Sequence, residues 1–329
     1  MKTIFYTCPY VPAEWIAAHG LRACRLLLDH TKSNSVLARA EGICPFVRSF
    51  VNEALKSTDA AGIIVTTVCD QMRRGFDILV RKCEIPAFLM NVPSTWQNYE
   101  SQKLYTDELK RLSRFLTKLG GKRPSNNALA KIMLEYDDAR KSVLGAREYL
   151  TARRYAEAII SLGRDGPDKT LNSITADEPP TDGVRLAIIG GPLMKQDFAL
   201  LDTIEQSGGR IVLDATETGE RGLCAAFNRR RLGDEPFMEL VGAYFGGIND
   251  ASRRPNSELY KWLRQELTLR DVQGIIFRRY LWCDMWHAEL GCLKNFTDLP
   301  VLDIDMGGNN NNEMQRTDNR IRAFLEMLQ

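Results

Sequence analysis

Short apolar runs alternate with helical patterns near both ends of the chain. The runs are partly β-branched and are bounded by turn residues, which predicts buried strands. The predicted strands are Thr3–Thr7, Gly62–Val68, Pro86–Val92, Arg185–Ile189, Arg210–Leu213, Gly274–Phe277 and Val301–Ile304. Because strands alternate with helices, we expect parallel sheets with right-handed crossovers, which is an α/β fold of the doubly wound class.

The middle of the chain is predicted to be helical. From about residue 100 to residue 165, apolar residues recur at helical spacing, as at Leu109, Leu112 and Leu116. Ser125 or Asn126 can cap the second of these helices. This helical stretch separates the two regions that contain the predicted strands.

Changes in composition predict where the chain is divided. Residues 163–180 are rich in Gly, Pro, Asp and Thr, which predicts a linker, and the asparagine run at 309–312 predicts a loop. We therefore expect an N-terminal α/β domain over residues 1–98, a helical segment and linker over 99–180, and a C-terminal α/β domain over 181–329.

The composition is that of an ordinary globular protein. The chain has 329 residues and a formal net charge of +2, so no broad charged field favours a nucleic acid or a membrane surface as partner. No stretch approaches the roughly 18 uninterrupted apolar residues of a membrane-spanning helix. The first residues are interrupted by Pro9 and Pro12 and lack the apolar core of a signal peptide, so we expect a cytoplasmic location.

Three of the eight cysteines lie where a strand is expected to end and a helix to begin: Cys44, Cys69 and Cys283. A helix N-terminus presents free N–H groups and a positive dipole end, which stabilise a thiolate. Three converging thiolates would hold a soft metal centre and leave one metal position open. The alternative is three buried structural thiols. The sequence assigns no role to Cys8, and Cys292 is either a spare ligand or a core residue.

Motifs for several other chemistries are absent from the sequence. Gly190-Gly191-Pro192 follows a predicted strand, but no Gly-Lys-Ser/Thr comes after it, so the chain has no phosphate loop of that type. No G-x-G-x-x-G motif occurs, so a dinucleotide site has no support. With three histidines in the whole chain, a His-rich zinc site is hard to build.

Several segments form an ordered set along the chain. They are Tyr10–Glu14 with Ala17–Gly20, Cys44-Pro45, Thr67–Arg74, Leu129–Arg140, Gly190–Pro192, Asp214–Arg221, Trp282–Asp284 and Arg320–Leu328. In order and spacing this set resembles the 2-hydroxyacyl-CoA dehydratase and benzoyl-CoA reductase family, from about residue 3 to residue 328. Asp137 departs from the pattern, because the family usually has asparagine there.

The resemblance implies two flavodoxin-like domains with a helical insertion and a [4Fe-4S] cluster held by Cys44, Cys69 and Cys283. It also implies an acyl-CoA substrate, a separate ATP-hydrolysing activator protein and a related second subunit, with a homodimer as the alternative. The further cysteines that hold a larger double cluster in some members, near Thr216 and near Gly246–Gly247, are absent here. We therefore expect a single cluster.

The resemblance suggests Glu14 as a catalytic acid or base. Glu14 occupies the P-x-E position, which resembles the site of a carboxylate near the substrate. The alternative is a glutamate in the first turn of a helix, where the helix dipole favours a negative charge.

Three functional interpretations follow. The first is the iron–sulfur subunit of an ATP-activated radical enzyme, which dehydrates 2-hydroxyacyl-CoA thioesters or reduces benzoyl-CoA-type rings. The second is an electron-relay or structural partner subunit, in which a fourth ligand or packed side chains close off the cluster from substrate. The third is a cluster-free α/β binding protein with inert cysteines. The sequence names neither the acyl group nor which of the two reactions applies.

Overall fold

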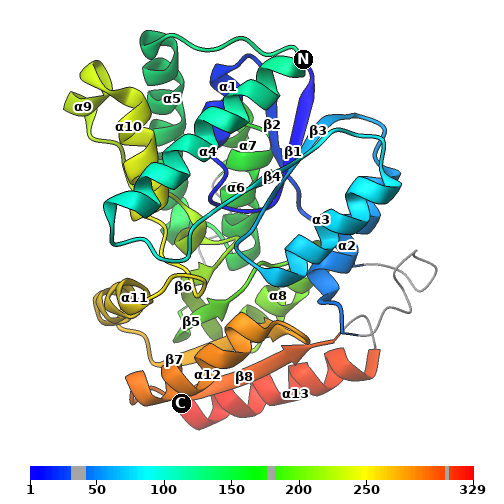
Figure 1. Cartoon of the computed structure of the whole chain (residues 1–329). Coiled ribbons are helices and arrows are strands. Elements are labelled where there is room, and N and C mark those ends of the chain that lie inside the picture. Colours follow the sequence, from blue (N-terminus) through cyan, green and yellow to red (C-terminus); the bar gives the residue numbers. More distant parts are fainter. Residues whose placement is uncertain (31–41, 176–181, 308–310) are drawn as a thin grey trace.

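Two parallel sheets form the framework of the protein. A computed structural model describes residues 1–30, 42–175, 182–307 and 311–329. In these ranges the strands form two four-stranded sheets in which all pairs are parallel (Figure 1). The strands are β1 (Thr3–Tyr6), β2 (Arg22–Arg25), β3 (Ala60–Thr66), β4 (Ala87–Met90), β5 (Val184–Gly190), β6 (Gly209–Thr216), β7 (Gly274–Tyr280) and β8 (Val301–Met306).

Both sheets share one topology. The first has the strand order β2-β1-β3-β4 and the second has the order β6-β5-β7-β8. The first strand of each half lies between its second and third strands, which is the start of the flavodoxin-like order. The chain therefore reverses its direction of winding between β1 and β3, and again between β5 and β7. The predicted doubly wound α/β class is confirmed.

The helices surround the two sheets and fill the middle of the chain. None in the described ranges is long and apolar enough to cross a membrane. They are α1 (Ala13–Ala18), α2 (Pro45–Lys56), α3 (Asp70–Lys82), α4 (Tyr99–Lys118), α5 (Asn126–Gly145), α6 (Ala152–Arg164), α7 (Pro167–Ser173), α8 (Phe198–Gln206), α9 (Arg229–Asp234), α10 (Pro236–Val241), α11 (Ser257–Leu269), α12 (Asp284–Phe296) and α13 (Asn311–Leu328).

Successive side chains along each central strand point to opposite faces of its sheet, and both faces are covered by helices. In β3, Ile64 joins the apolar cluster that contains residues of α1, α4 and α5, whereas Ile63 and Val65 pack with α2 and α3. In β5, Ile188 packs with α6, α8 and α13, whereas Ile189 packs with α11 and α12. Burial on both faces explains why these strands are nearly continuous apolar runs in the sequence.

A segment between β6 and β7 returns to pack against the first half of the chain. The ring of Phe237 in α10 lies 5.0 Å from that of Trp15 in α1. The hydroxyl of Tyr10 donates to the carbonyl oxygen of Ile248 at 3.1 Å. The domain division at residues 98 and 180 stays a prediction. Any such division has to allow for the segment between β6 and β7, which packs against the N-terminal half.

Three local expectations differ from the structure. Strand β2 was not predicted, because Arg22 and Arg25 interrupt its apolar character at the edge of the sheet. The linker expected at 163–180 is helical as far as Ser173, because Gly166 and Pro167 begin α7 instead of breaking the chain. Residues 176–181 lie outside the described ranges, as do 308–310, and the last two asparagines of the run begin α13.

The end of β5 makes a close approach that only glycine allows. A Cβ at Gly190 would overlap the carbonyl oxygen of Arg278 in β7. We expect Gly190→Ala to lower the free energy of unfolding by at least about 2 kcal/mol, because the two strands must separate. Urea denaturation measures this. As the control, Gly233→Ala in α9 meets no atom within 4 Å, and an equal loss in both variants would contradict the argument.

Candidate metal centre

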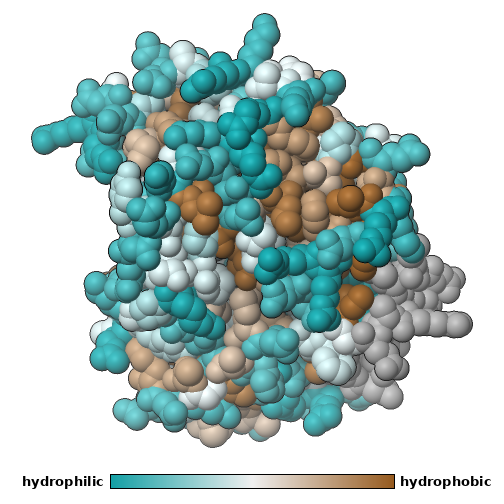
Figure 2. All heavy atoms as spheres, in the orientation of Figure 1, coloured by the Kyte–Doolittle hydropathy of each residue, from teal (hydrophilic) through white to brown (hydrophobic). Residues whose placement is uncertain are grey.

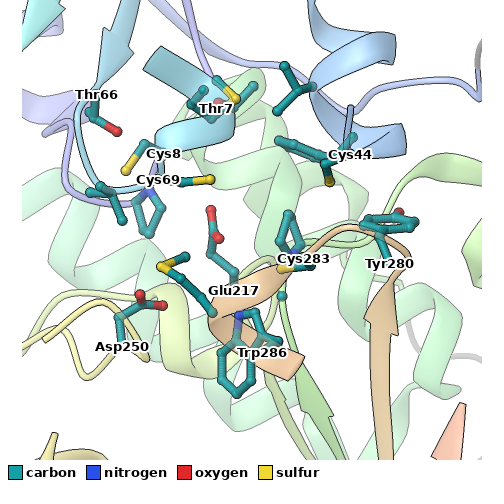
Figure 3. Close-up of a pocket in the computed structure, with 18 of the residues that line it drawn as sticks. Thr7, Cys8, Cys44, Thr66, Cys69, Glu217, Asp250, Tyr280, Cys283 and Trp286 are labelled. Atoms are coloured by element: carbon teal, nitrogen blue, oxygen red, sulfur yellow. The ribbon is translucent and has the colours of Figure 1, made fainter. Parts of the chain in front are cut away.

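A pocket opens between the two sheets at the carboxyl ends of their strands (Figure 3). Its lining comes from the segments that follow β1 and β3 in the first sheet and β5, β6 and β7 in the second. Parallel sheets bind ligands at this edge, at the point where the winding reverses. The pocket is small and opens to one side, and most of its lining surface is apolar.

The three cysteines singled out from the sequence all line this pocket. Cys44, Cys69 and Cys283 occupy the N-cap positions of α2, α3 and α12, and Figure 3 shows them around one space. Cys69 and Cys283 closely follow β3 and β7, as expected. Cys44 differs, because the strand before it, β2, ends at Arg25. The structure thus brings the thiols together, whereas their role as ligands stays a prediction.

Burial keeps the three thiols protonated in the absence of a metal. It raises the pKa of Cys69 to about 11 and that of Cys283 to about 12, and it also raises the pKa of Cys44. The backbone N–H groups of Phe46 and Val47 lower the pKa of Cys44, but burial is the larger effect. Helix N-termini alone therefore do not produce the expected thiolates, and a cation is needed to replace the protons.

The thiols also interact with one another. A negative charge on Cys44 raises the pKa of both Cys69 and Cys283, so the three sulfurs are near enough to repel each other as thiolates. Gln71 fixes two of the loops relative to each other: its Oε1 accepts from the backbone N–H of Cys44 at 3.2 Å, and its Nε2 donates to the carbonyl oxygen of Gly42 at 3.1 Å.

The indole of Trp286 supplies a free donor at the pocket. Trp286 is 2% exposed, and its Nε1 is buried without a hydrogen-bond partner. Figure 3 places the indole beside Cys283. A buried donor left unpaired costs about 1–3 kcal/mol, so this N–H indicates an acceptor in the pocket. Sulfur atoms of an iron–sulfur cluster accept such bonds, and three soft thiol donors suit its iron.

The arrangement fits a cluster better than a single ion. Within the described part of the chain, no group of three or more His, Cys, Asp or Glu side chains is arranged to hold a metal ion. In a cluster, each thiolate binds a different iron, so the ligands surround the group instead of meeting at one point. Thiols from both sheets around one pocket are compatible with this requirement.

Two carboxylates and a fourth thiol share the pocket and were not predicted as site residues. Glu217 follows β6, and Asp250 lies in the connection to α11. Cys8 follows β1, and burial raises its pKa to about 12. The rule that ligands gather at the carboxyl edge of a parallel sheet would have found Cys8, which follows the predicted strand Thr3–Thr7. It would have missed Glu217, because the strand predicted to end at Leu213 extends to Thr216.

Buried arginines hold the walls of the pocket. Arg221 donates to the carboxylate of Asp250 at 2.5 Å and to the carbonyl oxygen of Gly190 at 2.9 Å. As a result the pKa of Asp250 is lowered even though burial opposes this. Burial and the neighbouring charge of Asp250 instead raise the pKa of Glu217, despite the opposing effect of Arg25.

Glu14 lies in a different buried site. It is fully buried, its Oε1 accepts from Arg140 at 2.7 Å, and its Oε2 accepts from the hydroxyl of Tyr244 at 2.5 Å. Asp137 also pairs with Arg140, at 3.0 Å. Glu14 lines a pocket with Tyr136, Arg140 and Tyr244 and is not among the residues around the cysteines. A catalytic role for Glu14 stays a prediction.

Cys292 is not part of the cysteine pocket. It is exposed on α12, so it belongs neither to the core nor to the candidate centre. This exposure makes it a useful reference thiol.

The fold and the pocket define a class: a two-domain α/β protein with a thiol-lined site between two parallel sheets. The family described as 2-hydroxyglutaryl-CoA dehydratase, D-component, matches residues 8–328, and the chain belongs to this family. The resemblance drawn from the sequence is confirmed. The family name describes one component of a dehydratase and thus implies further components.

Other comparisons add little. No curated protein matches the chain. Among solved structures, the SBP FpvC from Pseudomonas aeruginosa in complex with Mn²⁺ is 12% identical, with 100% of this chain and 98% of that chain covered. Its TM-score is 0.25, so the likeness carries no argument about fold or function.

The protonated state of the thiols predicts slow alkylation of the metal-free protein. At pH 8, we expect iodoacetamide to modify Cys69 and Cys283 far more slowly than the exposed Cys292, because only thiolates react. With a pKa of about 11 for Cys69, its rate should rise roughly tenfold per pH unit between pH 8 and pH 10. Mass spectrometry of the labelled peptides measures the rates. A rate for Cys69 that is already constant above pH 7 would disprove the protonated state.

The ion pairs of Glu14 predict a structural contribution. Glu14→Ala leaves the buried Arg140 with one carboxylate fewer, and we expect it to lower the free energy of unfolding by about 3 kcal/mol. Glu14→Gln, which keeps a hydrogen-bonding side chain beside Tyr244, should lose less. Urea denaturation compares the variants, and a loss below about 0.5 kcal/mol for Glu14→Ala would show that these bonds do not stabilise the fold.

Proposed function

We propose that this chain is the iron–sulfur subunit of an ATP-activated radical enzyme that acts on acyl-CoA thioesters. The reaction is the dehydration of a 2-hydroxyacyl-CoA or the reduction of a benzoyl-CoA-type ring. The family assignment supports the enzyme class. The observation that carries the proposal is the placement of Cys44, Cys69 and Cys283 around one pocket at the switch points of both sheets.

The proposed ligands are Cys44, Cys69 and Cys283, and the group that they would hold is a [4Fe-4S] cluster. When bound, such a cluster supplies a low-potential electron and a Lewis-acidic iron. The N–H groups at the N-termini of the three helices would then stabilise the thiolates, and the unpaired indole N–H of Trp286 would be available to a sulfur. Apolar side chains such as Val68 and Met72 line the same pocket and limit the access of water.

Partner proteins belong to the same proposal. The chain has no phosphate loop, which agrees with ATP hydrolysis on a separate activator protein. Figure 2 shows a patch of apolar side chains in the upper half of the viewed face, whereas hydrophilic residues dominate much of the rest. Exposed apolar patches mark interaction sites, and we propose a related second subunit, or a second copy of the chain, as the partner. A cytoplasmic location is part of the proposal.

A relay role is the second candidate. The pocket contains donors beyond the three cysteines, namely Cys8, Glu217 and Asp250. A fourth ligand among them that substrate cannot displace would close the cluster and leave electron transfer as its task. Substrate chemistry instead requires an open or exchangeable position.

The content of iron and acid-labile sulfide tests the proposal. In protein purified without oxygen, we expect about four of each per chain. Cys69→Ser should lose most of both, because a serine oxygen is a poor ligand for this iron. Cys292→Ser is the matched control, since its thiol is exposed and outside the pocket.

Two results would contradict the proposal. A wild-type protein that is folded but metal-free, and that cannot be reconstituted with iron and sulfide, would favour the cluster-free binding protein. Equal metal loss in Cys69→Ser and Cys292→Ser would show that the pocket is not the binding site.

A further inference from the structure

The carboxylate of Glu217 enters the cysteine pocket from the second sheet. Glu217 follows β6, whereas Cys44 and Cys69 come from the first sheet. Figure 3 shows its side chain pointing into the space between Cys69 and Cys283. Its side chain is 17% exposed, so it faces the pocket and not bulk water.

This carboxylate makes no hydrogen bond to any described residue. Its nearest cation is Arg25, whose Nη2 lies 3.9 Å from Oε1. The same Nη2 donates to the backbone carbonyl oxygen of Glu217 at 3.0 Å, so the arginine holds the main chain and leaves the carboxylate unbonded.

Asp250 shows the contrast. Its Oδ2 accepts from Arg221 at 2.5 Å, and its Oδ1 accepts from the backbone N–H of Ser252 at 2.9 Å. Asp250 therefore has its hydrogen bonds within the protein, whereas the Glu217 carboxylate has the ion pair with Arg25 at 3.9 Å and accepts no hydrogen bond from a described residue. A carboxylate without hydrogen bonds in such a site is costly, and a further cation would stabilise it.

The neighbours of Glu217 inside the pocket are the thiols. Its negative charge raises the pKa of both Cys69 and Cys283, so all three acidic groups lie near one another. Thiols that lose their protons to a metal repel the carboxylate more strongly. Positive charge between the sulfurs and the carboxylate would add to the stabilisation that Arg25 already gives.

Cys8 is a weaker candidate for the same task. Its thiol comes from the first sheet, as Cys44 and Cys69 do, whereas Glu217 enters from the second sheet.

We propose that the carboxylate of Glu217 is the fourth protein ligand of the metal–sulfur group held by Cys44, Cys69 and Cys283. The inference rests on the proposed function and deepens it. A carboxylate oxygen is a harder ligand than a thiolate and binds iron less tightly in such a group. With the group bound, Glu217 would close this position at rest. A substrate carbonyl oxygen would bind by displacing the carboxylate, so that a neutral ligand replaces an anionic one without any redox change.

The test compares reconstituted wild-type protein with Glu217→Ala and Glu217→Cys. Mössbauer spectra should show one iron with oxygen ligation in the wild type, and Glu217→Cys should convert that iron to sulfur ligation. After reduction with dithionite, added ethanethiol should change the electron paramagnetic resonance spectrum of Glu217→Ala at a concentration at least about tenfold lower than for the wild type, the smaller end of the effect of changing a residue around a metal site.

Asp70→Asn is the matched control. It removes one exposed negative charge next to Cys69 and alters a residue that does not line the pocket. It should leave the wild-type Mössbauer pattern and the response to ethanethiol unchanged. Circular dichroism and thermal unfolding establish that each variant is folded, and Glu217→Gln replaces Glu217→Ala if the latter is not.

The outcomes separate this inference from the proposed function. A wild-type protein that binds no iron contradicts the proposed function itself. A wild-type cluster that responds to ethanethiol as readily as that of Glu217→Ala overturns the Glu217 inference and leaves the three-cysteine site intact. Identical changes in Glu217→Ala and Asp70→Asn would show that only nearby negative charge matters, which also overturns it.

Discussion

The buried guanidinium of Arg221 is the interaction on which the geometry of the pocket depends. It donates at 2.9 Å to the carbonyl oxygens of Gly190 and Ala215, near the ends of β5 and β6, pairs with Asp250, and lies 4.7 Å over the ring of Trp286. Parallel strands leave carbonyl groups unpaired where their ladder stops, and these need donors wherever water is excluded. The planar guanidinium of Arg221 donates to more than one of these carbonyl groups. It thereby fixes the positions of the segments that carry the site.

Arg25 joins the two sheets in the same way. Its Nε donates to the carbonyl oxygen of Thr7 after β1, at 2.8 Å, and its Nη2 donates to that of Glu217 after β6, at 3.0 Å. The arginines thus place positive charge in the walls, while the space between them is lined by thiols and carboxylates. Since burial raises the pKa of the thiols, a cationic group that binds there would displace their protons.

The sequence was most informative where burial on both faces leaves an apolar run. That pattern located β3, and with it the position of Cys69 at the carboxyl edge of the sheet. It failed for the charged edge strand β2, and for Glu217, whose place depends on β6 extending to Thr216. It also gave no sign that Tyr244 bonds Glu14, because a contact between residues so far apart in the chain follows no periodicity.

The cysteines belong to both sheets, and this connects binding with the relative placement of the sheets. Cys44 and Cys69 precede helices that pack on the first sheet, and Cys283 precedes a helix of the second. A group that binds all three cysteines requires this relative placement of the two sheets. By thermodynamic linkage, its binding therefore stabilises that placement by the same free energy by which the placement favours binding. The bonds of Arg25 and the bond from Tyr10 to Ile248 join the two halves without using the thiols. These contacts form the site in advance, which spares a bound group the cost of assembling it.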